Sequence, residues 1–248
     1  MHPKVCDNLV TDHDPLLDLL RALRKERGIK RTFIASGVRY DLAERSPEFI
    51  RELAEHHTGG QVSVAPEHTD PEVLKRMKKP GIESYERFAG AFCQASEEAG
   101  KEQYLVPYFI TGHPGSTLKD TIALARYLKK NDMRPRQVQD FIPTPMAIAT
   151  AMYHTGIDPL SGDTVPVVRD LREKRMMKAL ILWWDEKQWP LAREALKKAG
   201  RTDLIGRRPE CLVPHESGDG RTGPAGRSFA KSRSTRASGP RGRPPRAR

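Results

Sequence analysis

The feature that most constrains the fold of this chain is an alternation of short strand-forming segments with helical segments. Runs rich in β-branched and aromatic residues, which are typical of strands, occur at residues 32–36, 61–65, 104–111 and 137–142. Each run is followed by a turn and then by a helical pattern. The sequence therefore predicts βαβ units with parallel strands and right-handed crossovers. Four such strands form an open arc, whose first strand would carry an unpaired edge.

Capping signals mark several helix starts. Ser46 and Asp70 each stand directly before a proline, a pattern that favours an N-cap followed by proline at the first helical position. Thr117, with Asp120 three residues later, has the form of a capping box. These signals support helices that begin shortly after the predicted strands.

The pattern changes after residue 142, where two prolines end the last predicted strand. Two further helices are expected at residues 169–184 and 187–199, because apolar residues recur there at helical spacing. Gly200 is suited to end the second of them. We therefore expect three parts: an α/β part at residues 1–142, a small helical extension at 143–216 and a tail at 217–248.

Positive charge is concentrated at the end of the chain. The formal net charge is +11, and residues 221–248 hold nine Lys or Arg and no acidic residue, which leaves about +2 on the first 220 residues. The tail is rich in Gly, Pro, Ser and Arg and has one aromatic residue, Phe229, so we expect it to be disordered. It is either an extension without function or a basic arm that makes weak, non-specific contacts with nucleic acid.

The composition favours a cytoplasmic protein. No apolar run is long enough to cross a bilayer, and the first residues lack the apolar core of a secretory leader. The three cysteines, Cys6, Cys93 and Cys211, are far apart, so a disulfide framework is not expected. We expect Cys93 to lie buried on an apolar helix face, and the adjacent histidines at 56 and 57 to be a cap or a surface pair.

Candidate binding residues follow the predicted strands, because ligands of α/β sheets sit at the carboxyl ends of the strands. Arg39 either clamps an anionic group or pairs with Asp41 at the rim. Glu67 and His68 either serve as acid and base or hold a ribose and an amino group, or else they only cap the next helix. The candidate residues are Ser36, Arg39, Glu67, His68, Gly112 and His113.

The turn at residues 112–117 admits two interpretations. Its glycines would let a ligand approach the backbone, and the following helix N-terminus favours an anionic group. A plain tight turn between strand and helix explains the same residues. At the start of the chain, His2, Cys6 and His13 are metal-ligand types, but no second nearby cysteine completes a zinc or iron–sulfur motif.

Several long phrases, taken in order, resemble the YgiQ-like (UPF0313-type) family of radical S-adenosylmethionine (SAM) proteins. They are MHPKVCDNLVTDHDPLLDLLR, IASGVRYDL, VAPEHTDPEVLKRMKKPG, QYLVPYFITGHPGST and QVQDFIPTPMAIATAMYHTG, followed by a tryptophan-containing extension. The resemblance covers about residues 1–215. It implies a partial (β/α) barrel, of which this chain is the back half, that holds a [4Fe–4S] cluster and SAM. The cofactor would then give a 5′-deoxyadenosyl radical that abstracts hydrogen from a substrate.

The sequence departs from this family at the cluster motif. Radical SAM enzymes hold the cluster on a CxxxCxxC loop after the first strand, and this sequence has no such motif. We expect Met1 to mark an internal start, a truncation or a frameshifted gene piece, and Cys6 to be the remaining member of a further cysteine group. By resemblance the strand-end residues are possible SAM or substrate contacts, and no cluster is expected in this chain alone. The alternatives are a non-catalytic remnant and a nucleic-acid-associated module that acts through the tail.

Overall fold

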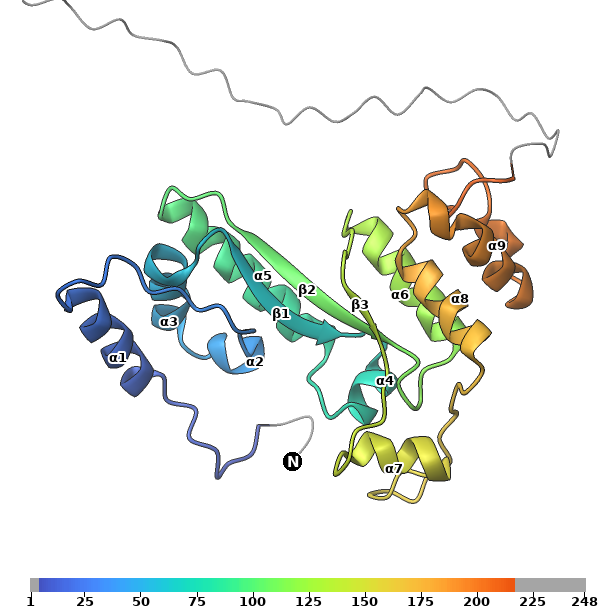
Figure 1. The fold of residues 1–248 in the computed structure, drawn as a ribbon, viewed down its shortest axis with the longest axis horizontal. Coiled ribbons are helices and arrows are strands. Elements are labelled where there is room, and N and C mark those ends of the chain that lie inside the picture. Colours follow the sequence, from blue (N-terminus) through green and yellow to red (C-terminus); the bar gives the residue numbers. More distant parts are fainter. Residues whose placement is uncertain (1–4, 217–248) are drawn as a thin grey trace, which may run out of the picture. The chain divides into compact units, whose positions relative to one another are not determined.

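The computed structural model describes residues 5–216, and within them three parallel strands form one open sheet (Figure 1). The strands are β1 (Gln61–Glu67), β2 (Tyr104–Thr111) and β3 (Val138–Asp140), in the spatial order β1-β2-β3. Sequential parallel pairing is what the alternation of strands and helices predicts. The predicted tail at 217–248 lies outside the described residues.

The predicted strand at 32–36 is not formed. That segment has no regular secondary structure, and one isolated parallel bridge, between Val38 and Val64, links the residues just after it to the sheet. Two backbone hydrogen bonds hold it: Ile34 N donates to His57 O (2.9 Å) and Val38 N donates to Ser63 O (2.9 Å). Because Ile34 bonds the turn before β1 rather than β1 itself, no ladder builds up along the edge.

The last strand is shorter than predicted. The sequence favours a strand over residues 137–142, whereas β3 ends at Asp140. It pairs with β2 from Phe109 to Thr111, and β2 itself ends at Thr111. One further backbone hydrogen bond, from Phe141 N to Thr111 O (2.8 Å), follows. Since β2 ends at Thr111, the edge of the sheet lies two residues earlier than expected.

Nine α-helices accompany the sheet in the described part of the chain. They are α1 (Asp14–Lys25), α2 (Tyr40–Ala43), α3 (Pro47–Glu52), α4 (Pro71–Arg76), α5 (Ile82–Glu98), α6 (Leu118–Lys130), α7 (Ile148–Thr155), α8 (Leu171–Ile181) and α9 (Trp189–Lys198). A π-helical turn, Leu53–His57, continues α3, and short 3₁₀ turns occur at Glu186–Gln188 and Thr202–Leu204. None of these helices is long and apolar enough to cross a membrane.

The capping predictions are confirmed. The Ser46 side chain accepts a hydrogen bond from Phe49 N at the start of α3, and Asp70 caps α4 through two backbone N–H groups. Thr117 and Asp120 form a reciprocal capping box at the start of α6. These caps satisfy backbone donors that helix starts otherwise leave unpaired, so local sequence chemistry fixes where each helix begins.

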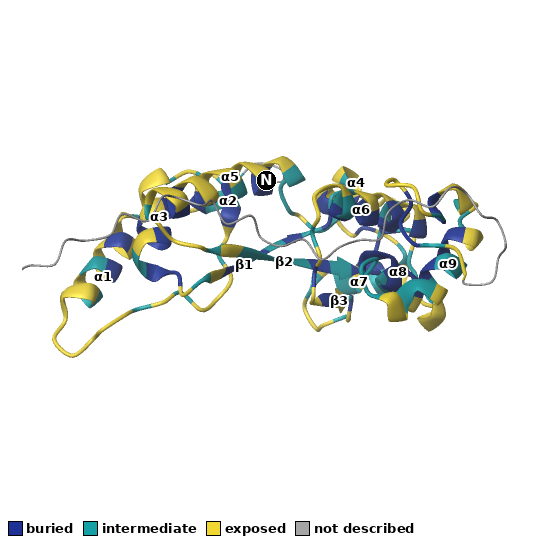
Figure 2. Ribbon diagram, turned by 90° about the horizontal axis from the view of Figure 1, so that it is seen from above, coloured by how far each residue is buried: buried dark blue, intermediate teal, exposed yellow. Residues whose placement is uncertain are grey.

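Two main apolar cores lie in the described residues. One packs α1, α2, α3 and α5 on β1, with Phe88 and Leu53 fully buried in it. The other joins α6 to α8 and α9, where Leu180 and Leu196 are fully buried. Figure 2 shows buried positions gathered in α6 and α8, whereas α1 and the loop after it are mostly exposed.

Two sequence predictions about these helices are wrong. Cys93 is exposed, because the buried face of α5 is set by Phe88 and Phe92 and the next residue turns toward solvent. His57 is fully buried rather than at the surface, because the π-helical turn directs it toward the loop at Thr32.

Candidate functional site

The parallel strands bring their carboxyl ends to one edge of the sheet. Glu67 ends β1, Thr111 ends β2 and Asp140 ends β3. Thr111 is paired with Asp140, whereas Glu67 is paired with Phe109, two residues before the end of β2. In sheets of this kind, the crevice beyond the carboxyl ends is where ligands bind. We call this the strand edge, defined by residues 64–68, 111–116 and 140–141.

Glu67 holds an unusual backbone conformation at the strand edge. Its φ is +68°, a region that residues with a side chain rarely adopt. His68 N donates to Pro66 O at 2.8 Å, which makes Glu67 the central residue of a γ-turn with positive φ, a rare and strained form. The ladder shifts register between Val64 and Glu67. Strain of this kind clusters at functional sites, so Glu67 stands out among the edge residues.

The Glu67 carboxylate lies among charged and buried polar groups. Lys79 Nζ is 3.3 Å from its Oε1, and the same Nζ donates to the carbonyl oxygen of Ala65 at 2.5 Å. The carboxylate is also close enough to Tyr40 to affect that phenol. Burial, and then the charges of Asp41 and Glu67, raise the pKa of Tyr40 well above its ordinary value, so the phenol stays protonated.

His68 is buried, with 1% of its surface exposed. Its Nδ1 accepts a hydrogen bond from Asp70 N at 3.0 Å, so the proton of the neutral ring is on Nε2. That Nε2 is buried and has no hydrogen-bond partner among the described residues. Burial lowers the pKa of His68 to about 4, so the ring is neutral at pH 7.

His113 is the second buried histidine of the strand edge, and it follows β2. Its Nδ1 is 2.8 Å from the carbonyl oxygen of Pro114, which can only accept, so Nδ1 donates and Nε2 carries the lone pair. The ring packs edge-on against Phe141, with 5.2 Å between centroids. Burial lowers the pKa of His113, and its charge would also disfavour a charge on His68.

The turn after β2 has structural reasons for its glycines. Gly112 and Gly115 have φ of +67° and +93°. A Cβ on Gly115 would overlap Cδ of Arg76, so α4 packs directly against this turn. Ser116 Oγ is buried and has no hydrogen-bond partner in the described part of the chain. The positive φ values therefore favour glycine at both positions, and the turn leaves one polar group unsatisfied beside the edge.

Ser36 and Arg39 come from the extended segment beside β1, and both are exposed. Arg39 Nε is 3.0 Å from Asp41 Oδ1, and the guanidinium makes a second contact with the same carboxylate at 3.1 Å. The structure thus shows the rim pair with Asp41. Among the candidate residues, His68 and His113 are close enough for the charge of one ring to affect the other, and Glu67 directly precedes His68 in the chain.

Sequence reasoning missed the polar groups contributed by β3 and α8. Thr111 Oγ1 donates to Asp140 Oδ1 at 2.8 Å, and Lys178 Nζ is 3.2 Å from Asp140 Oδ2. Lys174 Nζ donates to the Tyr153 hydroxyl at 3.3 Å beside the same turn. The overlong prediction of β3 hid Asp140, since the predicted strand end was two residues further along the chain.

The described residues do not fit an iron–sulfur cluster. Among residues 5–216, no group of three or more His, Cys, Asp or Glu side chains is placed to hold a metal ion. Cys6 precedes α1, Cys93 is exposed on α5, and Cys211 is buried near the end of the helical extension. His13 packs its ring against Phe49 instead, with 4.7 Å between centroids, and His2 lies outside the described residues.

Comparison with known families divides the chain into two matched regions. Residues 7–128 match the radical SAM superfamily, and residues 136–247 match a domain of unknown function, DUF3362. The first region contains Glu67, His68, Gly112 and His113, together with β1 and β2. The second begins just before β3 and includes α7, α8 and α9.

Curated relatives match the chain closely but are much longer. A UPF0313 protein of Bradyrhizobium diazoefficiens is 53% identical over 86% of this chain and 32% of its own length. A UPF0313 protein of Rhodopseudomonas palustris is 48% identical over 96% of this chain and 36% of its own length. A UPF0313 protein of Pseudomonas aeruginosa is 51% identical over 86% of this chain and 29% of its own length. The chain thus spans about a third of the length of these relatives. With about half of its matched residues identical to theirs, the chain belongs to the UPF0313 family of radical SAM proteins.

Proposed function

We propose that this chain supplies the carboxyl-terminal part of a radical SAM barrel, and that its strand edge binds SAM in a protein that also provides the cluster ligands. The single observation that carries the proposal is the strained γ-turn at Glu67, within the region that matches the radical SAM superfamily. A local sequence that only needed to end a strand would use glycine there, because glycine adopts positive φ without strain.

Glu67 is the residue we assign to ligand contact. Its carboxylate accepts hydrogen bonds only, which suits the ribose hydroxyls or the amino group of SAM. Lys79, with its Nζ 3.3 Å from Glu67 Oε1, orients the carboxylate in the absence of a ligand. The γ-turn fixes the backbone that carries this side chain, so a binding group of this kind is held in place before the ligand arrives.

His68 acts as a positioning residue in this proposal, because its burial keeps it from direct contact. The backbone N–H of His68 donates to Pro66 O and closes the γ-turn. The ring Nδ1 of His68 accepts from Asp70 N and joins the turn to the start of α4. His113 positions the turn after β2, because its ring packs on Phe141 and its Nδ1 donates to Pro114 O. The two neutral rings leave the edge without positive charge of their own at pH 7.

The chemistry of the cluster is outside this part of the proposal. Relatives in the radical SAM superfamily use SAM with a [4Fe–4S] cluster, and the residues described here do not offer a matching set of ligands. What this chain contributes is a preformed edge on three strands and a helical extension that covers α6.

A chimera tests the proposal. In the P. aeruginosa relative, the matched third would be replaced by the corresponding residues of this chain, which are 51% identical to it. The purified, anaerobically reconstituted chimera is expected to form 5′-deoxyadenosine from SAM under reducing conditions, as measured by chromatography. The unmodified relative serves as the positive control.

Two substitutions in the chimera sharpen the test. Glu67→Gln is expected to raise the Kd for SAM about tenfold, which corresponds to the loss of one charge-assisted hydrogen bond. Asp132→Gln, at an exposed position after α6, is expected to leave the Kd unchanged. Equal SAM affinity in the Glu67→Gln chimera and its parent would reject the assignment of Glu67.

A further inference from the structure

A second cavity lies at the opposite edge of the sheet, where the strands begin. Its volume is about 580 Å³, and it is bounded by the end of α1, the loop after it, Gly60 before β1 and Gln103 before β2. We call it the Phe33 pocket. The side chains that matter for its chemistry are Arg24, Lys30, Arg31, Phe33, His56 and Lys101.

Phe33 presents an aromatic face in this pocket. The residue is 47% exposed, which is high for a large apolar side chain beside a sheet. A Cβ built on Gly59 would lie 3.4–3.6 Å from three ring atoms of Phe33, so the ring rests directly against the backbone of Gly59. One part of the ring is therefore supported by the protein while a large part remains open to the pocket.

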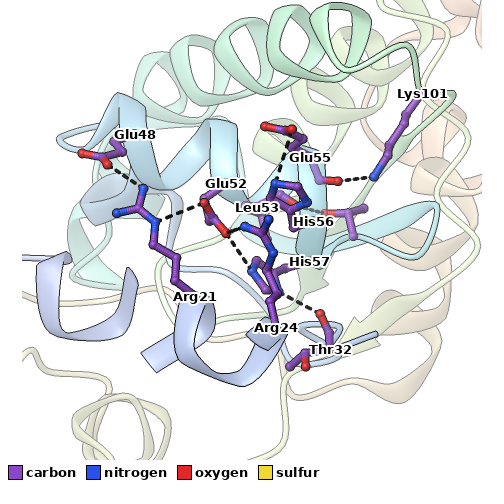
Figure 3. A network of polar contacts seen from close by, with 11 residues as sticks. Arg21, Arg24, Thr32, Glu48, Glu52, Leu53, Glu55, His56, His57 and Lys101 are labelled. Carbon is purple, nitrogen blue, oxygen red and sulfur yellow. Dashed lines mark hydrogen bonds and ion pairs between the residues drawn. The ribbon is translucent and has the colours of Figure 1, made fainter. Parts of the chain in front are cut away.

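Hydrogen bonds on both sides hold Phe33 in place. His57 Nδ1 donates to Thr32 O at 2.8 Å, and Ile34 N donates to His57 O at 2.9 Å. His57 Nε2 in turn lies 3.2 Å from Glu52 Oε1 (Figure 3). Because the backbone is fixed at the residues before and after Phe33, the exposed ring is preorganised rather than loosely attached.

The same network ties α1 to the pocket wall. Glu52 is 8% exposed and accepts from Arg24 at 2.5 Å and from Arg21 at 3.3 Å (Figure 3). Arg21 reaches Glu48 as well, at 2.6 Å. These ion pairs fix the end of α1, and the loop that carries Lys30 and Arg31 starts there.

Positive charge collects around the aromatic face. Lys25, Arg27, Lys30 and Arg31 follow one another closely at the end of α1 and in the loop, and all four are exposed. Their side chains make no ion pair or hydrogen bond with any other residue between 5 and 216. Exposed charges without partners are available to phosphate groups at little cost.

The acidic residues of the pocket are already engaged. Glu55 lies 3.3 Å from His56 Nε2, and the carboxylate of Glu102 accepts from the Tyr104 hydroxyl. Lys101 Nζ donates to the backbone oxygen of Glu55 rather than to a carboxylate, so its charge is not neutralised there. The balance of the pocket and its rim is therefore positive.

We propose that the Phe33 pocket binds single-stranded nucleic acid, with one unpaired base stacked on Phe33 and the flanking phosphates on Lys30 and Arg31. Aromatic platforms beside unpaired cations are how proteins bind single strands without sequence preference. A cavity of about 580 Å³ is within the usual size range for a small ligand, such as one nucleotide unit.

Other polyanions fit the pocket less well. A duplex keeps its bases stacked inside, so it would leave the Phe33 face unused. An acidic peptide would meet the cations but has no flat ring to place on Phe33. The aromatic face is thus the observation that favours a single strand, and a substitution at Phe33 is the decisive variant.

The test is fluorescence anisotropy of the full chain with a labelled oligouridine of about ten nucleotides, a length within the range that single-strand-binding domains cover. Phe33→Ala is expected to weaken binding about tenfold without changing its salt dependence. The double variant Lys30→Glu, Arg31→Glu is expected to weaken binding and to flatten the salt dependence. A duplex of the same length is expected to bind more weakly than the single strand.

Controls separate this pocket from charge elsewhere in the chain. The double variant Lys187→Glu, Lys197→Glu makes the same charge change at exposed positions in and before α9, and it is expected to change affinity less than twofold beyond the effect of net charge. Deletion of residues 221–248 tests the basic tail as the alternative source of binding. The proposal is overturned if Phe33→Ala binds like the parent chain, or if the tail deletion alone abolishes binding.

Discussion

Four residues other than glycine have a positive φ in the described part of the chain, and Glu67 is the one at the strand edge. Lys78 and Asp132 follow the ends of α4 and α6, where a left-handed residue commonly ends a helix. Glu67 instead ends a strand, where no such rule applies. Its conformation therefore has an energetic cost without a local structural benefit, which is what a functional constraint predicts.

Glu67→Gly is expected to raise the free energy of unfolding by about 1 kcal/mol, because glycine relieves a strain of about 1–3 kcal/mol at some cost in chain entropy. The same change is expected to weaken SAM binding in the chimera. Urea denaturation of the chain and SAM titration of the chimera measure the two effects. Asp132→Gly is the matched control, for which stability rises and SAM binding stays the same.

If Glu67→Gly lowered the stability instead, the γ-turn would not be strained and the argument from strain would fail. If both glycine variants weakened SAM binding equally, the effect would not be specific to the strand edge. The stability measurement thus tests the strain in the backbone, and the SAM titration tests the loss of the Glu67 side chain.

His68 predicts a pH dependence of stability. Its pKa in the folded chain is about 4 because burial disfavours the charged ring, whereas an unfolded histidine titrates near 6.5. Above pH 6.5 both states are neutral and His68 has no pH effect. As the pH falls from 6.5 toward 4, the unfolded chain binds the proton first, and stability decreases by an amount on the order of 3 kcal/mol.

His68→Asn is the informative variant for this effect. An asparagine oxygen takes the place of Nδ1 and can accept from Asp70 N, as in an Asx turn, while it does not titrate. Denaturation at pH 7.5 and pH 5 is expected to show a smaller stability difference for His68→Asn than for the parent chain. Parallel losses in both proteins would assign the pH effect to other groups.

At the scale of elements, the contacts of Glu52 with Arg21, Arg24 and His57 couple α1 to the π-helical turn, and His57 joins that turn to Thr32 beside Phe33. Burial would raise the pKa of Glu52, but hydrogen bonds from Arg24 and His57 outweigh it and hold this pKa below its ordinary value. A carboxylate with a lowered pKa stabilises the fold above about pH 4.5, and this contribution is lost as the pH falls through the folded-state pKa.

Glu52→Gln is expected to destabilise the chain by about 2 kcal/mol at pH 7, since it removes charge-assisted hydrogen bonds from a mostly buried site. Glu48→Gln, which removes only the exposed contact with Arg21, is expected to change stability by less than about 1 kcal/mol. Denaturant titration at pH 7 measures both. Equal effects from the two variants would show that the network is no more than a surface ion pair.

Local chemistry made much of the fold predictable. The caps at Ser46, Asp70 and Thr117 were recognisable because each depends on residues within four positions of one another. The strand at 104–111 has the bounds predicted for it, because its apolar run ends at a glycine. What depended on distant partners was missed: the edge at 32–36 lacks a ladder because Ile34 bonds His57 instead.

The candidate site was predictable only in part. Strand-end reasoning found Glu67, His68 and His113, since parallel strands end on one edge. It gave no sign of the γ-turn, because a positive φ at a non-glycine residue follows from the register shift between β1 and β2. Nor did it show that His57 is buried, because a π-helical turn has no clear sequence signal.

At the scale of the whole chain, two kinds of site lie at opposite edges of one sheet. The strand edge has buried neutral histidines and a carboxylate on a strained backbone, whereas the Phe33 pocket has exposed cations and an aromatic face. Substitutions at one edge are expected to leave the other unaffected, because each relies on its own hydrogen-bond network. This separation allows SAM binding and nucleic-acid binding to be tested independently in one protein.

The cysteines of the chain give the last prediction. Cysteine thiolates hold iron–sulfur clusters, and here Cys93 is exposed on α5 while Cys211 is buried beyond α9. These two cannot join Cys6 in one site without unfolding a core. Anaerobic reconstitution of this chain with iron and sulfide is therefore expected to leave no stable absorbance at about 400 nm. The chimera with the relative, reconstituted in parallel, is expected to show that band. A stable cluster in the chain alone that disappears with Cys6→Ala would contradict the prediction, and it would mean that the segment before α1 recruits ligands between molecules.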